Sequence, residues 1–370
     1  MLSLSAKIFL PLIFIFSSLV VSVNAQKPTS TPPQEEDTER IFTEEIKLNV
    51  NAFDPNGKFV ANVKKEDLVI MEDGRIHQAS SLRRIPANVL VVMDTGGEMR
   101  AAKSLTQTRE TAKSFINALK PEDSVAVMQY NDRAEIIAEW TDKINALKVL
   151  AGKANFGKRS MLYDALQTAT KFLQKSALEN RHLVLITDGT DSLNNLTEKD
   201  AAMQNLLKTD INIHVISYTQ MELADIEPRT KGTTKTPPPK AVPDEVTATL
   251  PSGIRDMNRA ARILTINTDR EFLKKMRERK KSLADGEKYL AALARDTNGE
   301  FILPVSNKEM IDKTTLVASF IDSSYVVTYA PKRALKESQN GEVRNIEVSS
   351  RRPDLQIEAR RKLIVAHNDK

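Results

Sequence analysis

The segment Asn88-Val-Leu-Val-Val-Met-Asp94 decides the fold of this chain. It is apolar from end to end between two polar residues, which is typical of a parallel strand covered by helices on both faces of a sheet. The same pattern recurs in His182-Leu-Val-Leu-Ile-Thr-Asp188, and this segment also ends in an aspartate. Two such segments predict an α/β fold built on a doubly wound, mostly parallel sheet.

Further predicted strands and helices alternate around these two segments. The additional strands are expected at 124–130 and 211–217, with a possible antiparallel edge strand at 134–140 and a short strand at 299–303. Helical spacing of apolar residues is found at 101–119, 160–175, 288–295 and 309–321. The alternation predicts one α/β domain over residues 86–322.

Short alternating segments flank this domain on both sides. Residues 41–85 contain strand patterns and the turn sequence Asp54-Pro-Asn-Gly57, and residues 323–366 contain strand patterns with Asn340-Gly341 as a hairpin turn. Because the two ends of a domain often lie close together, we expect the two segments to pair. The predicted architecture is an α/β domain inserted in a small β-sandwich-like unit formed by N- and C-terminal strands.

Residues 221–285 interrupt the alternation and are interpreted as a basic, partly disordered insertion. Thr230-Lys-Gly-Thr-Thr-Lys-Thr-Pro-Pro-Pro239 has no apolar periodicity. Residues 269–281 are basic with helical spacing, and we interpret them as a solvated helix that follows a strand parallel to the first two. This helix could therefore cover the edge at which those strands end. Contact of 270–281 with an anionic membrane surface is the alternative.

The N-terminal residues have the pattern of a secretory signal peptide, predicted at 1–25. Lys7 precedes an apolar run that continues through Val23, and Val23-Asn24-Ala25 offers a cleavage site. An uncleaved membrane anchor is the alternative. Residues 26–40 are rich in Pro, Thr and Glu and are predicted to form a flexible linker. We expect export to the periplasm, cell envelope or extracellular space, with no transmembrane span after cleavage.

Composition excludes several classes of function. The chain of 370 residues has no cysteine, which excludes disulfides, thiolate catalysis and thiolate metal sites. Its formal net charge is +5 and its basic and acidic residues are interspersed, so there is no basis for nucleic-acid binding. The four histidines do not have the spacing of metal ligands or of a catalytic triad.

Asp94 and Asp188 each follow a buried strand of the predicted sheet. The carboxyl ends of parallel strands meet at one edge, where ligands bind in such folds. We expect the two carboxylates to lie there side by side, with the hydroxyl of Ser160 close to them. Oxygen ligands of this kind suit hard divalent cations. The alternative is that both aspartates bond to loop N–H groups and that Ser160 caps the next helix.

The ordered set of these motifs resembles a von Willebrand factor type A domain of the exported bacterial kind with flanking β segments. The matching stretches are Val91-Val-Met-Asp94 with Gly96 and Glu98, then Ser160-Met-Leu-Tyr-Asp-Ala165, then Leu185-Ile-Thr-Asp-Gly189. The resemblance implies a binding or adhesion module, not an enzyme, whose partner is a protein or a cell-surface ligand. It also implies a metal-ion-dependent adhesion site made from Asp-x-Ser-x-Ser, a Thr and an Asp.

The adhesion motif is degenerate in this chain. By position Asp94 is its first Asp, Ser160 replaces its Thr and Asp188 is its later Asp, whereas Gly96 and Glu98 stand where it has serines. The candidate ligands for Mg²⁺, Mn²⁺ or Ca²⁺ are therefore Asp94, Glu98, Ser160 and Asp188. A metal-independent scaffold in a cell-envelope complex is the alternative function.

An aspartic protease-like hydrolase is the alternative from another class. Asp94-Thr95-Gly96 matches the triplet of enzymes in which two aspartates share a proton. Such an enzyme needs a second triplet, and Thr187-Asp-Gly-Thr190 has the wrong order. The predicted α/β alternation also conflicts with the nearly all-β fold of those proteases.

Overall fold

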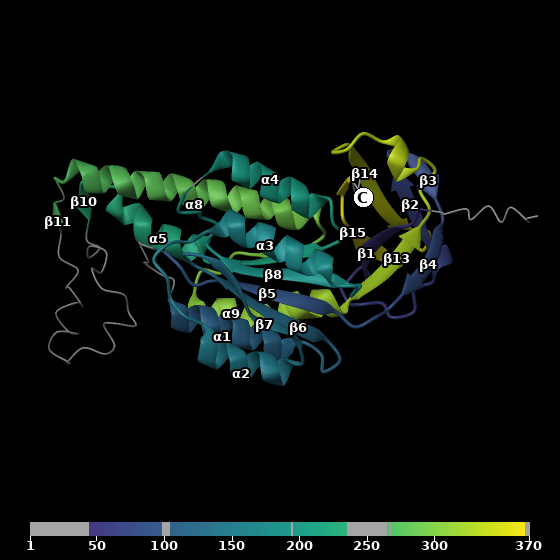
Figure 1. Cartoon of the computed structure of the whole chain (residues 1–370), viewed down its shortest axis with the longest axis horizontal. Coiled ribbons are helices and arrows are strands. Elements are labelled where there is room, and N and C mark those ends of the chain that lie inside the picture. Colours follow the sequence, from purple (N-terminus) through teal and green to yellow (C-terminus); the bar gives the residue numbers. More distant parts are fainter. Residues whose placement is uncertain (1–43, 98–103, 194, 235–264, 267, 367–370) are drawn as a thin grey trace, which may run out of the picture. The chain divides into compact units, whose positions relative to one another are not determined.

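A computed structural model of the chain describes residues 44–97, 104–193, 195–234, 265–266 and 268–366. The predicted signal peptide and linker lie outside these ranges, as does Glu98. Within them the predicted fold class is confirmed, because a six-stranded, mostly parallel sheet lies among helices and two antiparallel sheets accompany it (Figure 1). None of the described helices combines the length and the apolar character needed to span a bilayer.

The six-stranded sheet has the predicted buried strands at its centre. From one side to the other its strands are β12 (Phe301–Ile302), β9 (Asn212–Ser217), β8 (Arg181–Thr187), β5 (Asn88–Asp94), β6 (Ser124–Tyr130) and β7 (Ala134–Thr141). All neighbours are parallel except β6 and β7, which confirms the predicted antiparallel strand. Met93 of β5 lies beside Ile186 of β8, so both strands end at the same edge, called here the carboxyl edge.

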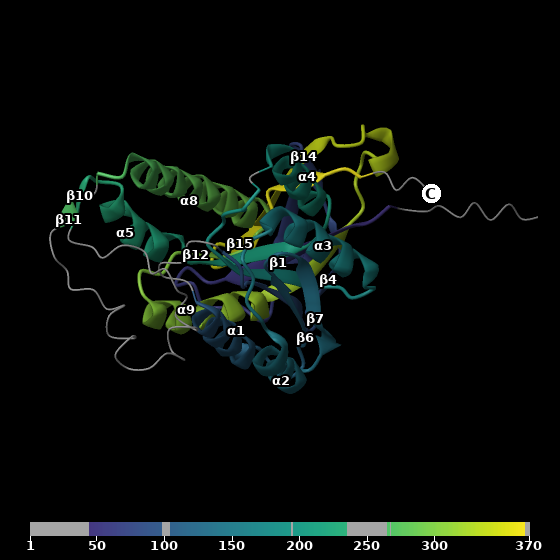
Figure 2. The same cartoon turned by 60° about the vertical axis from the view of Figure 1, so that its left-hand side comes forward.

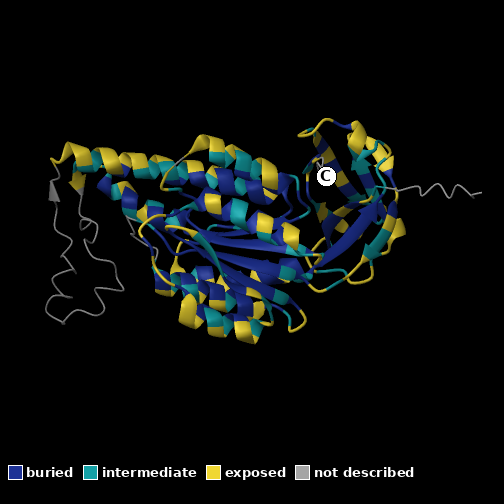
Figure 3. Cartoon of the chain, in the orientation of Figure 1, coloured by how far each residue is buried: buried dark blue, intermediate teal, exposed yellow. Residues whose placement is uncertain are grey.

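Helices cover both faces of this sheet, and Figure 1 shows α3, α4 and α8 on one face and α1, α2 and α9 on the other. The helices are α1 (Leu105–Ala118), α2 (Lys143–Lys153), α3 (Leu162–Lys175), α4 (Leu196–Leu207), α5 (Thr219–Arg229), α8 (Arg270–Asp296) and α9 (Asn307–Asp322). Alternate residues of β5 enter different cores, with Val89, Val91 and Met93 on the α1 side and Leu90 and Val92 on the α3 side. The four central strands β9, β8, β5 and β6 are accordingly buried along almost all of their length (Figure 3).

One long helix replaces the two that the sequence predicted at 269–281 and 288–295. Helix α8 is continuous because Leu283, between the two predicted segments, is buried against α5. Ile226 of α5 and Met276 of α8 complete this small core, and the two helices lie side by side in both views (Figures 1 and 2). The two ends of the predicted insertion 221–285 are therefore helical, whereas its interior at 235–264 lies outside the described residues.

The N- and C-terminal segments form a pair of antiparallel sheets. One sheet has the order β15 (Gln356–Ala359), β1 (Ile46–Phe53), β13 (Ser324–Tyr329), β4 (Ala79–Arg83), and the other has the order β16 (Lys362–Ile364), β14 (Val343–Ser350), β2 (Leu68–Glu72), β3 (Arg75–His77). The predicted pairing is confirmed, since β1 lies between β13 and β15 and β2 pairs with β14. Leu48, Ile70, Val327 and Val348 share one core. A separate two-residue pair joins β10 (Thr233–Thr234) to β11 (Thr265–Ile266).

A buried arginine of this β unit forms hydrogen bonds with the α/β domain. Arg360 is 1% exposed, and its guanidinium donates to the carbonyl oxygens of Leu207, at 3.3 Å, and Thr209. Burial lowers the pKa of Arg360 to about 10. The carbonyl groups at the C-terminal end of α4 offset part of this cost, because that end of a helix carries partial negative charge.

Candidate functional site

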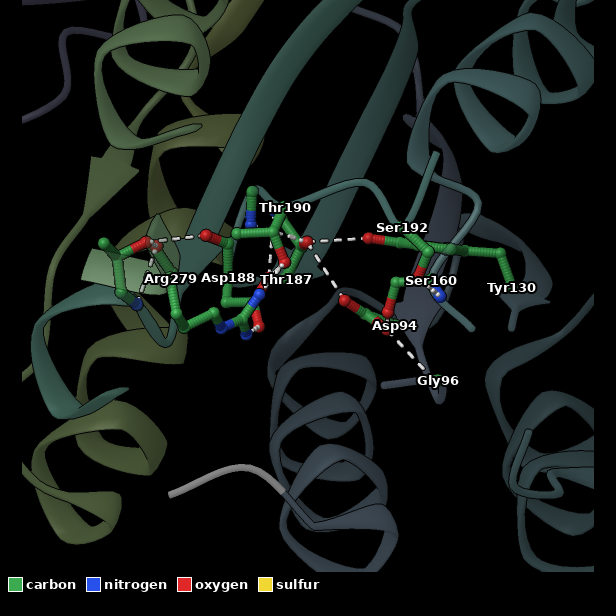
Figure 4. Close-up of polar contacts among 12 residues, drawn as sticks. Asp94, Gly96, Tyr130, Ser160, Thr187, Asp188, Thr190, Ser192 and Arg279 are labelled. Atoms are coloured by element: carbon green, nitrogen blue, oxygen red, sulfur yellow. Dashed lines mark hydrogen bonds and ion pairs between the residues drawn. The ribbon is translucent and has the colours of Figure 1, made fainter. Parts of the chain in front are cut away.

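Asp94 ends β5 at the carboxyl edge and is fully buried. Its Oδ1 accepts hydrogen bonds from the backbone N–H of Gly96 at 3.0 Å and from the hydroxyl of Ser160 at 2.9 Å (Figure 4). Its Oδ2 accepts a longer one, at 3.4 Å, from the hydroxyl of Thr187. All three donors are neutral, and each of them directs a hydrogen atom, not a lone pair, at the carboxylate of Asp94.

Thr187 continues the network into the sheet. Its Oγ1 accepts from the N–H of Gly189 at 3.0 Å and lies 2.6 Å from the hydroxyl oxygen of Tyr130. Because the single hydroxyl hydrogen of Thr187 is directed at Asp94, Tyr130 must donate. Burial, and then the charge of Asp94, raise the pKa of Tyr130 well above its ordinary value. Tyr130 therefore keeps its proton and orients Thr187.

Asp188 follows β8 and is also fully buried. Its Oδ1 accepts from the backbone N–H of Thr190 at 2.9 Å and from the hydroxyl of the same residue at 2.7 Å. Its Oδ2 accepts from Nη2 of Arg279 in α8 at 2.8 Å, while Nη1 of Arg279 donates to Thr190 Oγ1 at 2.6 Å (Figure 4). The guanidinium thus binds both the carboxylate and the hydroxyl that supports it.

Arg279 is surrounded by acidic groups, and its side chain is only 20% exposed. Burial lowers its pKa, but the charges of Asp188, Glu222 and Asp94 together outweigh that effect, so the pKa lies above the ordinary arginine value. Glu222 is itself buried in the first turn of α5. Arg279 therefore stays cationic and compensates charge contributed by β5, by the loop after β8 and by α5.

Ser160 is held by the loop that follows β8. Its N–H donates to Oγ of Ser192 at 2.8 Å, and the N–H of Ser192 donates to its carbonyl oxygen at 2.8 Å. The interpretation of Ser160 as a helix cap is wrong, because α3 begins at Leu162 with Met161 in the N-cap position. The hydroxyl of Ser160 is instead satisfied by Asp94.

Gly96 allows the loop before α3 to approach β5 closely. A Cβ atom on Gly96 would lie 1.6 Å from the carbonyl oxygen of Arg159 and 2.9 Å from Cα of Asn131. No side chain fits without movement of backbone. The position at which the adhesion motif has its first serine is therefore closed in this chain, and not merely lacking a hydroxyl.

Three of the four predicted metal ligands lie at the carboxyl edge, namely Asp94, Ser160 and Asp188, while Glu98 lies outside the described residues. In the part of the chain that the structure describes, no group of three or more His, Asp or Glu could hold a metal ion. Asp94 faces hydrogen-bond donors and Asp188 is paired with Arg279. The described residues therefore do not fit the divalent cation that the family resemblance implied. Their contacts agree with the alternative in which each aspartate holds loop backbone.

Five residues of this network were not identified from the sequence: Tyr130, Thr187, Thr190, Ser192 and Arg279. Only one signal pointed toward any of them. The basic helix was expected to reach the edge at which β5 and β8 end, and the Arg279 contact confirms that it does. Nothing in the sequence selected Arg279 from the other cations of that helix.

Two adjoining cavities open at the carboxyl edge. The first has a volume of about 320 Å³ and is lined by Gly97, Arg159, Ser160, Thr190, Asp191, Ser192, Leu193 and Arg279. The second, of about 530 Å³, shares Thr190, Asp191, Ser192 and Arg279 and extends along α8. Arg159 is exposed, and within the described residues its guanidinium makes no hydrogen bond or ion pair. The first cavity thus combines buried structural charges with the accessible guanidinium of Arg159.

Part of the chain matches a known protein family. Residues 89–190 match the model of the von Willebrand factor type A domain. Comparison with curated proteins gives no match.

Several solved structures are similar to the chain at low sequence identity. An aerotolerance-related membrane protein from Bacteroides fragilis, with multiple mutations to serines, is 15% identical with a TM-score of 0.39, over 64% of this chain and 98% of that one. A von Willebrand factor type A protein from Catenulispora acidiphila is 9% identical with a TM-score of 0.40, over 89% and 76%. A mutant of the PilB minor pilin from Streptococcus sanguinis is 11% identical with a TM-score of 0.43, over 65% and 62%.

The family match spans β5, β6, β7 and β8 and both aspartates at their carboxyl edge. With the doubly wound sheet in which these strands lie, it shows that the chain contains a von Willebrand factor type A domain.

Proposed function

We propose that this chain is an exported, non-enzymatic binding module whose type A domain recognises a protein or cell-surface partner at the carboxyl edge of its sheet. The observation that carries the proposal is the accessible guanidinium of Arg159 at a cavity of about 320 Å³ on that edge. Ligands of parallel α/β sheets bind at the carboxyl ends of the strands. The cavity therefore occupies the position at which this class of fold presents its ligands.

The lining of the cavity indicates the chemistry of the partner. Ser160, Thr190 and Ser192 line it with polar groups, and Leu193 adds an apolar side chain that is 53% exposed. An arginine fork pairs with a carboxylate through two parallel hydrogen bonds. We therefore infer that the partner presents an acidic side chain, with an apolar neighbour that packs on Leu193.

Site-specific photo-crosslinking in the native cells tests the binding surface. A photoreactive residue in place of Leu193 is expected to capture the partner, whereas one in place of Leu178, which is 37% exposed and outside the cavity, is expected not to. Arg159→Glu should abolish the capture and Lys148→Glu, an exposed site on α2, should leave it unchanged. Capture from Leu178 alone would place recognition elsewhere on the molecule, and capture from Leu193 that survives Arg159→Glu would contradict the role of Arg159 in it.

Export is tested separately by the N-terminus of the mature protein. The signal pattern predicts cleavage after Ala25, so that sequencing should find Gln26 first in a periplasmic, envelope or extracellular fraction. An intact N-terminus in a membrane fraction would support the retained anchor, and an intact chain in the cytoplasm would contradict export.

A further inference from the structure

We propose that Arg279 supplies, at the carboxyl edge of this type A domain, the positive charge that a divalent cation supplies where the adhesion motif is complete. The carboxyl edge is then held in its folded form without metal. This inference concerns the charge balance and stability of the edge. It stands or falls independently of which partner the edge binds.

The position of the guanidinium is the first argument. Nη2 of Arg279 lies 2.8 Å from Oδ2 of Asp188, and Nη1 lies 2.6 Å from Oγ1 of Thr190. Thr190 in turn donates to the other carboxylate oxygen of Asp188. A metal ion that used Asp188 as a ligand would have to displace an arginine fixed at two points.

The charge of the cluster is the second argument. Asp94, Asp188 and Glu222 are all buried, and each of them acts on Arg279 electrostatically. Isolated buried carboxylates are strongly disfavoured in the ionised form, so a cluster of them needs a cation nearby. Among the described residues, the cation that forms an ion pair with Asp188 is Arg279.

The helix that carries Arg279 is firmly anchored, which is the third argument. Met276 lies three residues before Arg279 and Leu283 lies four residues after it, and both are completely buried against α5. Further along α8, a Cβ atom on Gly286 would lie 2.4 Å from the carbonyl oxygen of Gly189, which shows how closely the helix packs on the loop of Asp188. The packing of α8 therefore fixes the position of Arg279 at the carboxyl edge, which distinguishes it from a flexible surface side chain.

The rest of the edge is consistent with a cation other than a metal. The hydroxyl of Ser160 donates to Asp94 and so has its hydrogen directed at the carboxylate. The place of the first motif serine is closed, because a side chain on Gly96 would overlap the carbonyl oxygen of Arg159. Arg279 compensates the negative charge of the carboxylates, and neither the hydroxyl of Ser160 nor a serine hydroxyl at position 96 is needed as a ligand.

The test is a metal titration of the mature protein followed by thermal unfolding, with Mn²⁺ binding measured directly by electron paramagnetic resonance. We expect the melting temperature to be the same in chelator and in millimolar Mg²⁺, Mn²⁺ or Ca²⁺, and Mn²⁺ to stay free. Arg279→Gln should melt below Arg277→Gln, a control on the same helix whose guanidinium, within the described residues, donates only to the carbonyl oxygen of Thr230, at 3.3 Å. The difference in melting temperature between Arg279→Gln and Arg277→Gln should shrink as the pH is lowered, because the uncompensated carboxylates of Arg279→Gln can then take up protons.

A second variant keeps the test decisive if Arg279→Gln does not fold. The double variant Asp188→Asn/Arg279→Gln removes both charges and should fold better than Arg279→Gln alone. A metal-dependent rise in the melting temperature of the wild-type protein, or tight Mn²⁺ binding, would overturn the proposal. Equal melting of Arg279→Gln and Arg277→Gln, or failure of the double variant to improve on Arg279→Gln, would overturn it as well.

Discussion

Gly286 of α8 packs directly on Gly189, so that a Cβ atom on Gly286 would lie 2.4 Å from the carbonyl oxygen of Gly189. Gly189 has a φ of +77° and follows Asp188 directly. Arg279 precedes Gly286 by about two helical turns and so lies on the same face of α8. The glycine contact therefore sets the distance at which Arg279 meets Asp188.

Gly286→Ala is expected to destabilise the protein, by about 1–3 kcal/mol, because the added methyl group must displace backbone. Gly152→Ala is the matched control, since Gly152 is also helical and a Cβ atom there meets nothing within 4 Å. Alanine favours a helix over glycine by up to about 1 kcal/mol, so this change should be neutral or stabilising. Urea unfolding of both variants measures the difference, and the same sign for both would show that α8 does not lie close to the Asp188 loop.

Gly96→Ser restores the serine of the adhesion motif and is expected to fail as a metal-site repair. Its Cβ atom would overlap the carbonyl oxygen of Arg159, so the variant should lose stability by about 1–3 kcal/mol and gain no response to Mg²⁺. Thermal unfolding with and without the ion measures both effects, and Gly152→Ser controls for the change in residue type. A Gly96→Ser protein that is as stable as wild type and is stabilised by Mg²⁺ would show that the edge can open to hold a metal.

Two buried histidines should make the protein sensitive to acid. Nδ1 of His182 lies 3.0 Å from Nε2 of His214, and the N–H of Glu300 donates to Nδ1 of His214 at 3.1 Å. His214 must then donate through Nε2 to His182, which donates through its own Nε2 to Asn180 Oδ1 at 3.0 Å. Burial lowers the pKa of His182 to about 3, and burial with the charge of His182 lowers that of His214 well below its usual value. Both rings are therefore neutral in the folded protein.

The sign of the pH effect follows from these directions. Unfolded histidine has a pKa of about 6.5, so below that pH the unfolded chain binds more protons and the folded state loses stability as the pH falls. Each histidine should contribute a slope of up to about 1.4 kcal/mol per pH unit between about pH 6 and pH 4. We expect His182→Gln to show a shallower dependence of the free energy of unfolding on pH in this window. A slope identical to that of the wild-type protein would mean that His182 is not buried as a neutral ring.

The sequence identified the central parallel strands because they are short, almost continuously apolar runs, the pattern of strands buried on both faces of a sheet. Helix α2 was not predicted. Its apolar residues do not define one face, since Ile144 is 62% exposed while Ala146 and Leu150 are buried. Asp142, which caps its first turn by accepting from the N–H of Asn145, was the available signal.

The candidate site was predictable only in part. Asp94 and Asp188 could be placed at one edge because both follow strands of one parallel sheet. Arg279 is 91 residues from Asp188 along the chain. Its contact depends on how α8 packs against α5 and Gly189, which no local pattern specifies. The closure of the edge at Gly96 likewise depends on a carbonyl group from a different loop.

A double-mutant cycle between Asp188 and Arg279 tests the central claim, that this ion pair balances the charge of the carboxyl edge. The free energy of unfolding in urea would be measured at neutral pH for the wild type, Asp188→Asn, Arg279→Gln and the double variant. Removing one partner of a buried pair leaves the other charge uncompensated, so Arg279→Gln should cost about 3 kcal/mol or more and the double variant should be more stable than Arg279→Gln. If the two single effects instead add to within about 0.5 kcal/mol, the residues are not coupled and the account of the edge is contradicted.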